Sequence, residues 1–208
     1  MDAPVGAKVG VGFKEQISKE KVAALVEAHD SQGLLGSLNF LDVKAGDAVF
    51  VPAGVPHAIE AGILVLELQE PTDLSILLEW DGFAVDGDKD GHLNLGYDTA
   101  LDALKFEPLT STENQEIVTR FEFGAKSSHK IFNSIADDFF RADYLVGDDA
   151  VVDAGFGVLL ILSGTGELDF ENYGKFKVES GDAVVIPYCA GAFKVSGCKG
   201  IISRPPAA

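Results

Sequence analysis

One stretch of this sequence occurs twice, and no other feature constrains the fold as much. Residues 46–54 read GDAVFVPAG and residues 181–191 read GDAVVIPYCAG, with five residues between the first glycine and the proline in both copies. Each copy opens with a turn-forming Gly-Asp pair and continues as an apolar strand. The strand stops at proline, which has no amide hydrogen to donate to a sheet. Two copies of one strand unit predict a fold built from two related β units.

The rest of the chain also reads mainly as short strands separated by Gly, Asp and Pro. Many short strands at close spacing are typical of an antiparallel sandwich or barrel. The predicted strands are residues 8–13, 48–51, 63–68, 74–78, 117–123, 139–145, 158–162, 167–170, 183–186 and 200–202.

A helix is predicted after the first strand. Ser18 has the residue type of an N-cap, and Val22, Leu25 and Val26 recur on one helical face. Residues 32–38 are expected to add a further helical turn.

Three polar or glycine-rich stretches are predicted to be loops. Residues 81–91 hold several aspartates and glycines, but they fit no twelve-position EF-hand register, so a solvated loop is favoured over a calcium site. Residues 105–114 read as a linker between two halves. Gly164-Thr165-Gly166 lies between two predicted strands and precedes no helix, which favours a hairpin turn over a phosphate loop.

Charge and composition exclude several classes of partner. Thirty-three acidic and sixteen basic residues give a formal net charge of −17. This surplus repels nucleic-acid phosphates and anionic lipids, so we expect no nucleic-acid and no membrane partner. The first residues show no signal-peptide pattern, and two cysteines are too few for a disulfide scaffold. We therefore expect a cytoplasmic globular protein, with Cys189 and Cys198 as small buried residues and Trp80 in a core.

The first copy of the repeat carries the strongest candidate for chemistry. After Gly54 come Val55, Pro56 and His57, whereas the second copy has no histidine at this point. A neutral imidazole at a strand end is a common ligand for zinc, iron or manganese. Glu67 follows ten residues later in the run 63–68, where it is either an active-site acid or an outward surface residue, and the sequence leaves both open.

The other three histidines give weaker signals. His29 ends the predicted helix, His92 lies beside the acidic loop, and His129 belongs to the second half. No pair of histidines has the spacing of a known ligand motif, so none of these three is predicted to bind a metal.

The residues around His57 resemble a known family. The spacing Gly46-x5-Pro52-x-Gly54-x2-His57 resembles the second signature motif of cupins, which are small jelly rolls. The longer run over residues 46–73, GDAVFVPAGVPHAIEAGILVLELQEPTD, resembles type I mannose-6-phosphate isomerases. The run EPTDLSILLEW at 70–80 and the RPP at 204–206 extend this resemblance.

The resemblance implies an all-β bicupin fold with a small helical insertion. It covers the middle and C-terminal part of a typical family member. Residues 1–104 would form a partial first cupin that carries the helical segment and the metal motif. Residues 105–208 would form a complete second cupin that lacks the histidine.

The resemblance also implies an activity. Family members are metal-dependent aldose–ketose isomerases that interconvert mannose 6-phosphate and fructose 6-phosphate, with one zinc per site. His57 matches the family's final histidine ligand, and Glu67 is our candidate for an acid–base role. Leu77 stands where the family has a catalytic arginine. The family's remaining ligands, a glutamine, a histidine and a glutamate, belong to strands that precede the segment equivalent to residues 2–13.

Two functional hypotheses follow. The first is a zinc-dependent isomerase that acts on a sugar phosphate. The second is a non-catalytic cupin module that binds a sugar or serves as an interaction or regulatory domain, which Leu77 and the missing ligands favour. An iron dioxygenase-type cupin needs two histidines and a carboxylate together, a set that this sequence does not supply. An incomplete first cupin would expose a sheet edge and apolar surface, which predicts a homodimer, strand exchange or association with a missing N-terminal piece.

Overall fold

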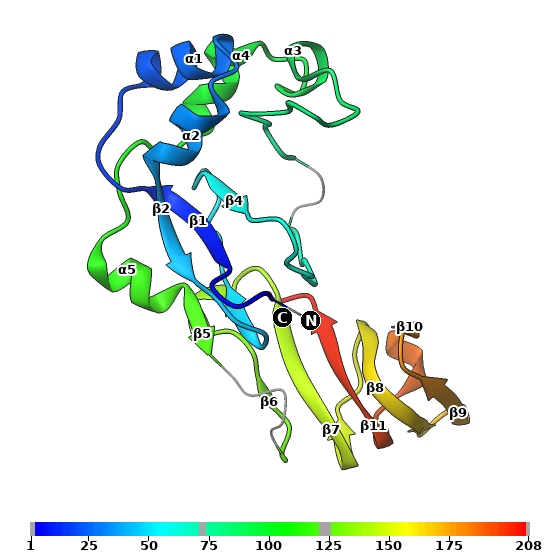
Figure 1. The fold of residues 1–208 in the computed structure, drawn as a ribbon. Helices are drawn as coiled ribbons and strands as arrows, with labels where there is room; N and C mark the ends of the chain where they lie inside the picture. The colour runs from blue at the N-terminus through cyan, green and yellow to red at the C-terminus, as the bar shows by residue number, and fades with distance from the viewer. Residues whose placement is uncertain (1–2, 71–73, 121–125, 207–208) are drawn as a thin grey trace. The chain divides into compact units, whose positions relative to one another are not determined.

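The computed structural model describes residues 3–70, 74–120 and 126–206 (Figure 1). They form two compact units. The N-terminal unit consists of the described residues of Asp2–Ala45 and Val51–Gln115. The C-terminal unit consists of Gly46–Phe50 and the described residues of Glu116–Ala208. Because these units are defined by packing, the predicted division into cupins at residue 104 stays a prediction.

The N-terminal unit contains a three-stranded antiparallel sheet in the order β2-β1-β4. Its strands are β1 (Lys8–Phe13), β2 (Leu38–Asp42) and β4 (His57–Ile59). The central strand β1 is buried at every position after Lys8. Its helices are α1 (Lys19–Glu27), α2 (Ser31–Ser37), α3 (Gly87–Asp90), α4 (Tyr97–Ala100), α5 (Ser111–Glu116) and the 3-10 turn η1 (Leu101–Ala103).

Helix α1 confirms the predicted cap and the predicted buried face. The Ser18 hydroxyl accepts a hydrogen bond from the Lys21 amide at 3.2 Å, and Val22, Leu25 and Val26 are buried. Burying each such side chain stabilises a fold by about 1.5–3 kcal/mol. This face packs into a core that also contains Phe13, Leu34, Leu38, Trp80 and Leu101.

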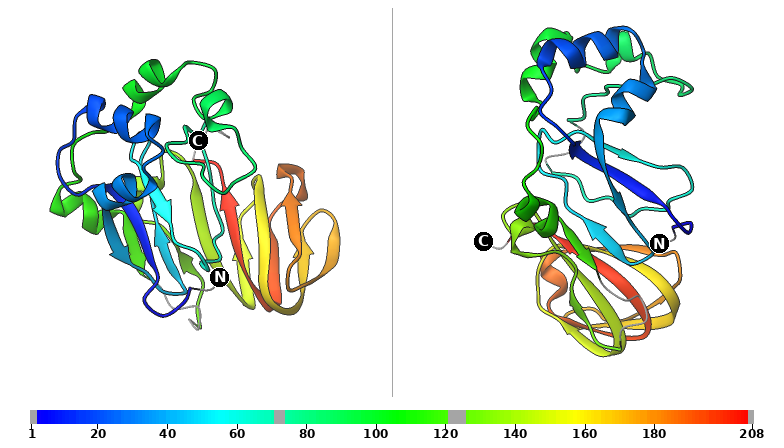
Figure 2. Two further views of the ribbon diagram at one scale, coloured as in Figure 1. Left: turned by 45° about the horizontal axis from the view of Figure 1, so that its top comes forward. Right: turned by 60° about the vertical axis from the view of Figure 1, so that its left-hand side comes forward.

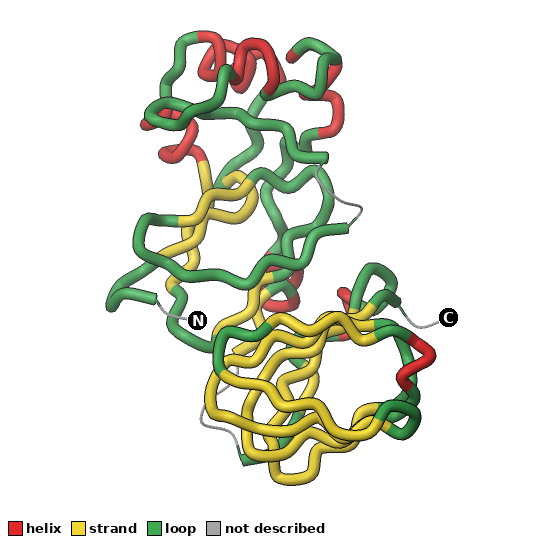
Figure 3. Tube along the Cα trace, turned by 90° about the vertical axis from the view of Figure 1, so that its right-hand side faces the viewer, coloured by secondary structure: helices red, strands yellow, loops and turns green. Residues whose placement is uncertain are grey.

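The C-terminal unit is built almost entirely of strands, which wrap around one core in Figures 2 and 3. The sheet order is β10-β8-β11-β7-β6, with β9 paired to the other half of β8, while β3 and β5 form a separate pair. The short 3-10 turns are η2 (Ser134–Ala136) and η3 (Tyr188–Ala190). The strands are β3 (Asp47–Val49), β5 (Val118–Arg120), β6 (His129–Lys130), β7 (Arg141–Val152), β8 (Gly157–Phe170), β9 (Gly174–Glu179), β10 (Ala183–Ile186) and β11 (Phe193–Arg204).

The all-β prediction is confirmed, and the sequence repeat is also a backbone repeat. Gly46 and Gly54 have φ angles of 95° and 77°, and their counterparts Gly181 and Gly191 have 97° and 78°. These left-handed conformations suit glycine, since other residues pay a steric cost there. Each copy is therefore one strand, β3 or β10, held between two glycine turns.

The predicted hairpin at Gly164-Thr165-Gly166 is wrong. These residues lie inside the single long strand β8, which replaces the two predicted strands 158–162 and 167–170. Gly164 has a φ of 88°, and the register of β8 against β11 shifts at this point. The glycines therefore bend a continuous strand, because its partner β11 continues alongside it in both directions.

Two further predicted strands, 63–68 and 74–78, are also wrong. Both stretches lie outside any helix or strand in the structure. A strand needs a neighbouring strand for its amides and carbonyls, and within the described residues no strand pairs with either stretch. The predicted strand 117–123 corresponds to β5, and its last residues fall outside the described ranges. None of the helices in the described ranges is long and apolar enough to cross a membrane.

Candidate functional site

His57 lies at the first position of β4, directly after the glycine turn of the first repeat. The turn is closed by a hydrogen bond from the Val55 amide to the Pro52 carbonyl at 3.1 Å. The Gly12 amide of β1 donates to the Pro56 carbonyl at 2.8 Å, and Val11 is the antiparallel partner of His57. Sheet pairing and the turn therefore fix the backbone that carries this imidazole.

Gly54 anchors the same turn from the other side. The Lys105 amide donates to the Gly54 carbonyl at 2.7 Å. A Cβ at position 54 would lie 2.4 Å from the Ala103 carbonyl oxygen, so a side chain there would force this contact apart. Position 54 therefore needs glycine for two reasons: its left-handed φ and the close approach of the Ala103 carbonyl.

The His57 ring is exposed and has one defined partner. Its Nδ1 lies 3.4 Å from the Val55 carbonyl oxygen. A carbonyl only accepts, so this contact puts the ring hydrogen on Nδ1 and leaves the Nε2 lone pair available. No hydrogen bond to Nε2 comes from the described residues. A histidine in this tautomer can bind a metal ion through Nε2.

Glu67 is exposed and lies in an extended stretch without secondary structure. Neighbouring Leu64 and Val65 are also exposed, at 63% and 46%. No hydrogen bond or ion pair joins Glu67 to His57 within the described residues. Glu67 therefore lies in an outward, solvated position. Its acid–base role stays a prediction.

The described residues do not complete a zinc site. A zinc site normally needs at least three protein donors, whereas His57 offers one imidazole nitrogen. Across the described ranges, no group of three or more His, Cys, Asp or Glu residues is arranged to hold a metal ion. His57 therefore fits the role of a single ligand, and any zinc would need donors beyond those described.

Leu77, at the position where the resemblance implies an arginine, is half-buried in the N-terminal unit. It packs against the core of the N-terminal unit, and its amide donates to the Gly91 carbonyl at 2.8 Å. Its own carbonyl accepts a hydrogen bond from the Tyr97 hydroxyl at 2.7 Å.

Tyr97 is the residue here that the sequence analysis did not single out. Its hydroxyl also lies 3.2 Å from the Gly87 carbonyl oxygen, and its ring stacks 6.0 Å from Trp80. Burial, together with the charge of Asp88, raises the pKa of Tyr97 to about 12. It therefore stays neutral and ties the loop around Leu77 to α4.

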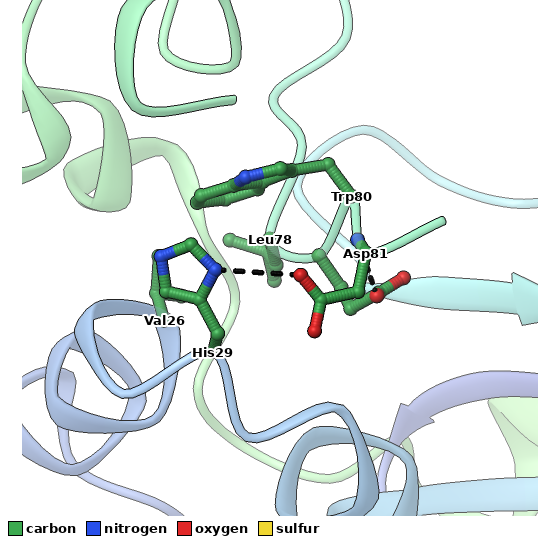
Figure 4. A pocket seen from close by; sticks show the side chains of 6 residues that line it. Val26, His29, Leu78, Trp80 and Asp81 are labelled. Atoms are coloured by element: carbon green, nitrogen blue, oxygen red, sulfur yellow. Dashed lines mark hydrogen bonds and ion pairs between the residues drawn. The ribbon is translucent and has the colours of Figure 1, made fainter. Parts of the chain in front are cut away.

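His29 borders a shallow hollow beside Trp80 and Asp81 (Figure 4). Its Nδ1 lies 3.5 Å from Asp81 Oδ1 and its Nε2 lies 3.7 Å from Asp88 Oδ2. The edge of its ring faces Trp80 at 4.9 Å. Each ring nitrogen therefore has a carboxylate oxygen close to it, and these contacts link the end of α1 to Asp81 and Asp88.

The remaining histidines serve the backbone. His92 Nδ1 accepts from the Gly96 amide at 3.1 Å, and its Nε2 donates to the Asp88 carbonyl at 3.0 Å. His129 Nδ1 lies 3.1 Å from the Ser127 carbonyl oxygen. The structure thus brings none of the three other histidines into a set with His57.

The sequence of this chain is similar to sequences of known isomerases. It is 26% identical over 193 residues to the Bacillus subtilis protein named "Probable mannose-6-phosphate isomerase GmuF", an alignment that covers 90% of this chain and 57% of that protein. It is 38% identical over 73 residues to the mannose-6-phosphate isomerase of Streptococcus mutans, covering 35% of this chain and 22% of that protein. No family model matches the chain.

The fold is similar to that of solved isomerases. The crystal structure of the mannose 6-phosphate isomerase from Bacillus subtilis superposes with a TM-score of 0.68 at 21% identity, over 98% of this chain and 62% of that one. The Salmonella typhimurium enzyme, bound to fructose 6-phosphate and zinc, gives a TM-score of 0.54 at 15% identity, over 90% of this chain and 45% of that one.

These comparisons establish the resemblance and the fold. The chain resembles mannose-6-phosphate isomerases in sequence and shares their β fold over nearly all of its length. It spans 57% of the length of the first curated relative.

Proposed function

We propose that this chain contributes to a metal-dependent aldose–ketose isomerase that interconverts mannose 6-phosphate and fructose 6-phosphate. The observation that carries the proposal is His57, held by the repeat's glycine turn with Nε2 available, in a chain similar to such isomerases over 90% of its length. The ligand class is a sugar phosphate, and the cofactor we propose is zinc.

The reaction moves protons between two adjacent carbons. A base removes the proton from C2 of the aldose and a proton is returned to C1, while the hydroxyl proton on O2 leaves and O1 gains one. A carboxylate can carry a proton between such atoms, which is the role we propose for Glu67. A bound zinc supplies polarisation of the sugar oxygens. The described residues supply only His57 toward that ion, so we assign no step to it.

The test combines metal content with activity. In a form of the protein that supplies the remaining donors, we expect about one zinc per chain by mass spectrometry, lost in His57→Ala but kept in His29→Ala, the matched surface histidine. Isomerase activity should fall about a hundredfold or more in His57→Ala. Zinc-dependent activity that survives in His57→Ala would refute the assignment.

Glu67 is tested separately. Glu67→Gln should keep zinc and lower the turnover rate by about 10²-fold or more, the usual range for a lost acid–base group. Glu70→Gln, an exposed glutamate three residues away, should leave turnover unchanged. Equal activity of the two variants would assign Glu67 to the solvated surface.

The alternative function is a non-catalytic cupin module. Leu77, half-buried against the core where the resemblance implies an arginine, is the observation that favours it. Calorimetric titration with fructose 6-phosphate, with and without zinc, separates the two functions. Binding that needs zinc supports the isomerase, and binding that ignores zinc supports the module.

The setting we propose is the cytoplasm, without nucleic-acid or membrane partners, as the net charge of −17 favours. The homodimer or strand exchange predicted from the sequence belongs to the same proposal.

A further inference from the structure

Two arginines and one aspartate gather on the core-facing side of the sheet in the C-terminal unit. Arg204 ends β11 and Arg141 begins β7, and the two are direct antiparallel partners. Asp143 pairs with Ile202, which in turn pairs with Leu159. Directly paired residues project to the same face of a sheet, and alternate residues of one strand share that face. Ile202 and Leu159 belong to the core of this unit, so the three charged side chains lie on its core-facing side.

Asp143 is a half-buried carboxylate without a hydrogen-bond donor. Among the described residues it has no hydrogen bond and no ion pair. Lys130, its partner on β6, already binds Asp137 through a hydrogen bond of 2.7 Å. Burial raises the pKa of Asp143, although the charges of Arg204, Arg141 and Lys130 act in the opposite direction. The carboxylate oxygens are therefore acceptors that a bound group could satisfy.

The two arginines have donors without acceptors. Arg204 Nη2 donates to the Asp153 carbonyl at 2.6 Å, whereas its Nε is buried and has no partner within the described residues. Arg141 Nε donates to the Pro205 carbonyl at 2.9 Å, and the described part of the chain supplies no acceptor for its terminal nitrogens. Like charges directly opposite each other in a sheet are unfavourable. An anion between the two guanidiniums would accept from both and offset their repulsion.

We propose that Asp143, Arg141 and Arg204 form a binding site for hydrogen phosphate. Guanidinium groups only donate hydrogen bonds, and an ionised carboxylate only accepts them. A ligand that satisfies both must carry charged acceptor oxygens and also one hydroxyl. A phosphate group with one proton has this combination, because its unprotonated oxygens accept from the arginines and its P–OH donates to Asp143. Sulfate is also tetrahedral but has no proton at neutral pH, so the carboxylate repels it.

This site does not depend on the isomerase proposal. Its three residues belong to the C-terminal unit, whereas His57 belongs to the N-terminal unit. Arg204 is the first residue of the RPP run, to which the isomerase proposal gives no role. The net charge of −17 disfavours anions in general, so binding has to come from these local donors.

The test compares phosphate with sulfate by calorimetric titration of the whole chain at pH 7.5. We expect one phosphate per chain, bound at least tenfold more tightly than sulfate. Asp143→Asn removes the repelling charge, so it should weaken phosphate binding, strengthen sulfate binding and abolish the preference. Arg204→Gln should weaken the binding of both anions at least tenfold. Lys177→Gln, at an exposed cation of β9 in the same unit, is the control and should change neither.

Phosphorus NMR provides a second measurement. The resonance of inorganic phosphate should broaden with wild type and with Lys177→Gln. It should stay sharp with Arg204→Lys, which keeps the charge but loses Nε, and circular dichroism verifies that each variant is folded. Displacement of phosphate by glycerol 3-phosphate at pH 6 would extend the ligand class from the free ion to monoesters.

Three outcomes would overturn the proposal. A wild-type chain that binds no phosphate at about 10 mM would mean that only water bridges Asp143 and the arginines. Equal affinities for phosphate and sulfate would indicate an adventitious ion only. Phosphate binding that is unchanged in a folded Arg204→Gln would place the ion elsewhere on the chain.

Discussion

At the scale of single residues, the two thiols lie in contrasting surroundings. Cys198 is 3% exposed, and burial raises its pKa. Cys189 is exposed, which corrects the expectation that both are buried, and its Sγ lies 3.5 Å from the Tyr173 hydroxyl. Thiolates are the reactive form, so Cys198 should be the slower of the two.

We therefore expect one fast-reacting thiol per native chain with Ellman's reagent at pH 8, and two after unfolding in urea. In Cys189→Ser the fast phase should vanish while the slow thiol remains. Two fast thiols in the native chain would contradict the burial of Cys198.

Glu113 closes a capping box at the start of α5 and gives a prediction about pH. Its Oε2 accepts from the Thr110 amide at 2.7 Å, and Oε1 accepts from Lys105 Nζ at 3.0 Å. The Thr110 amide first, and Lys105 next, lower the pKa of Glu113 from 4.5 to about 2. A carboxyl whose pKa falls on folding stabilises the fold above its unfolded pKa. This contribution is lost as pH falls from about 4.5 to 2.

Urea unfolding between pH 5 and pH 2.5 measures this effect. The free energy of unfolding should fall less steeply with decreasing pH in Glu113→Gln than in wild type. Glu107→Gln, at an exposed glutamate on the approach to the same helix, is the matched control. If all three proteins share one slope, the capping box does not carry the shift.

At the scale of elements, sequence reasoning succeeded where the signals are local. The Ser18 cap and the face of Val22, Leu25 and Val26 lie within one helix, so α1 could be predicted. The glycine turns and proline of the repeat likewise predicted β10. Residues 63–68 and 74–78 failed because a strand depends on partners far along the chain, which propensity does not encode.

The candidate site, like the fold, could be predicted only where its signal is local. His57 could be located because its turn is a local pattern of glycine and proline. A metal site needs donors from several strands, and spacing along one segment cannot supply them. Leu77 likewise packs against the core of the N-terminal unit, whose members lie far from it in the sequence.

Gly147 of β7 lies opposite the point where the register of β11 shifts, and this gives a prediction about stability. A Cβ on Gly147 would lie 2.2 Å from the Cys198 carbonyl oxygen and 2.7 Å from its amide nitrogen. Both atoms belong to β11, which is paired on both sides and cannot yield cheaply. Gly147→Ala should therefore lower the free energy of unfolding by about 3 kcal/mol.

The control for this substitution is Gly36→Ala in α2. A Cβ there meets nothing within 4 Å, so alanine should stabilise the helix by about 0.5–1 kcal/mol. Urea unfolding followed by circular dichroism measures both changes. A tolerated alanine at 147 would mean that β7 and β11 do not approach as closely as described.

At the scale of the whole molecule, each unit has its own core. Leu159, Ile161 and Leu168 belong to the core of the C-terminal unit. Leu101 and Trp80 belong to the core of the N-terminal unit. Since Trp80 is the only tryptophan of the chain, its fluorescence reports on the N-terminal unit, whereas circular dichroism reports on both.

This arrangement predicts that core truncations act on separate transitions. Leu101 and Leu159 are at most 1% exposed, so replacing either by alanine should cost its unit about 2–5 kcal/mol. Leu101→Ala should shift the fluorescence transition to lower urea, while Leu159→Ala should leave it in place and shift part of the circular dichroism transition. A unit with its own core can unfold by itself, so fluorescence and circular dichroism should report different unfolding transitions. Equal shifts of both probes in both variants would show instead that the two cores unfold as one cooperative structure.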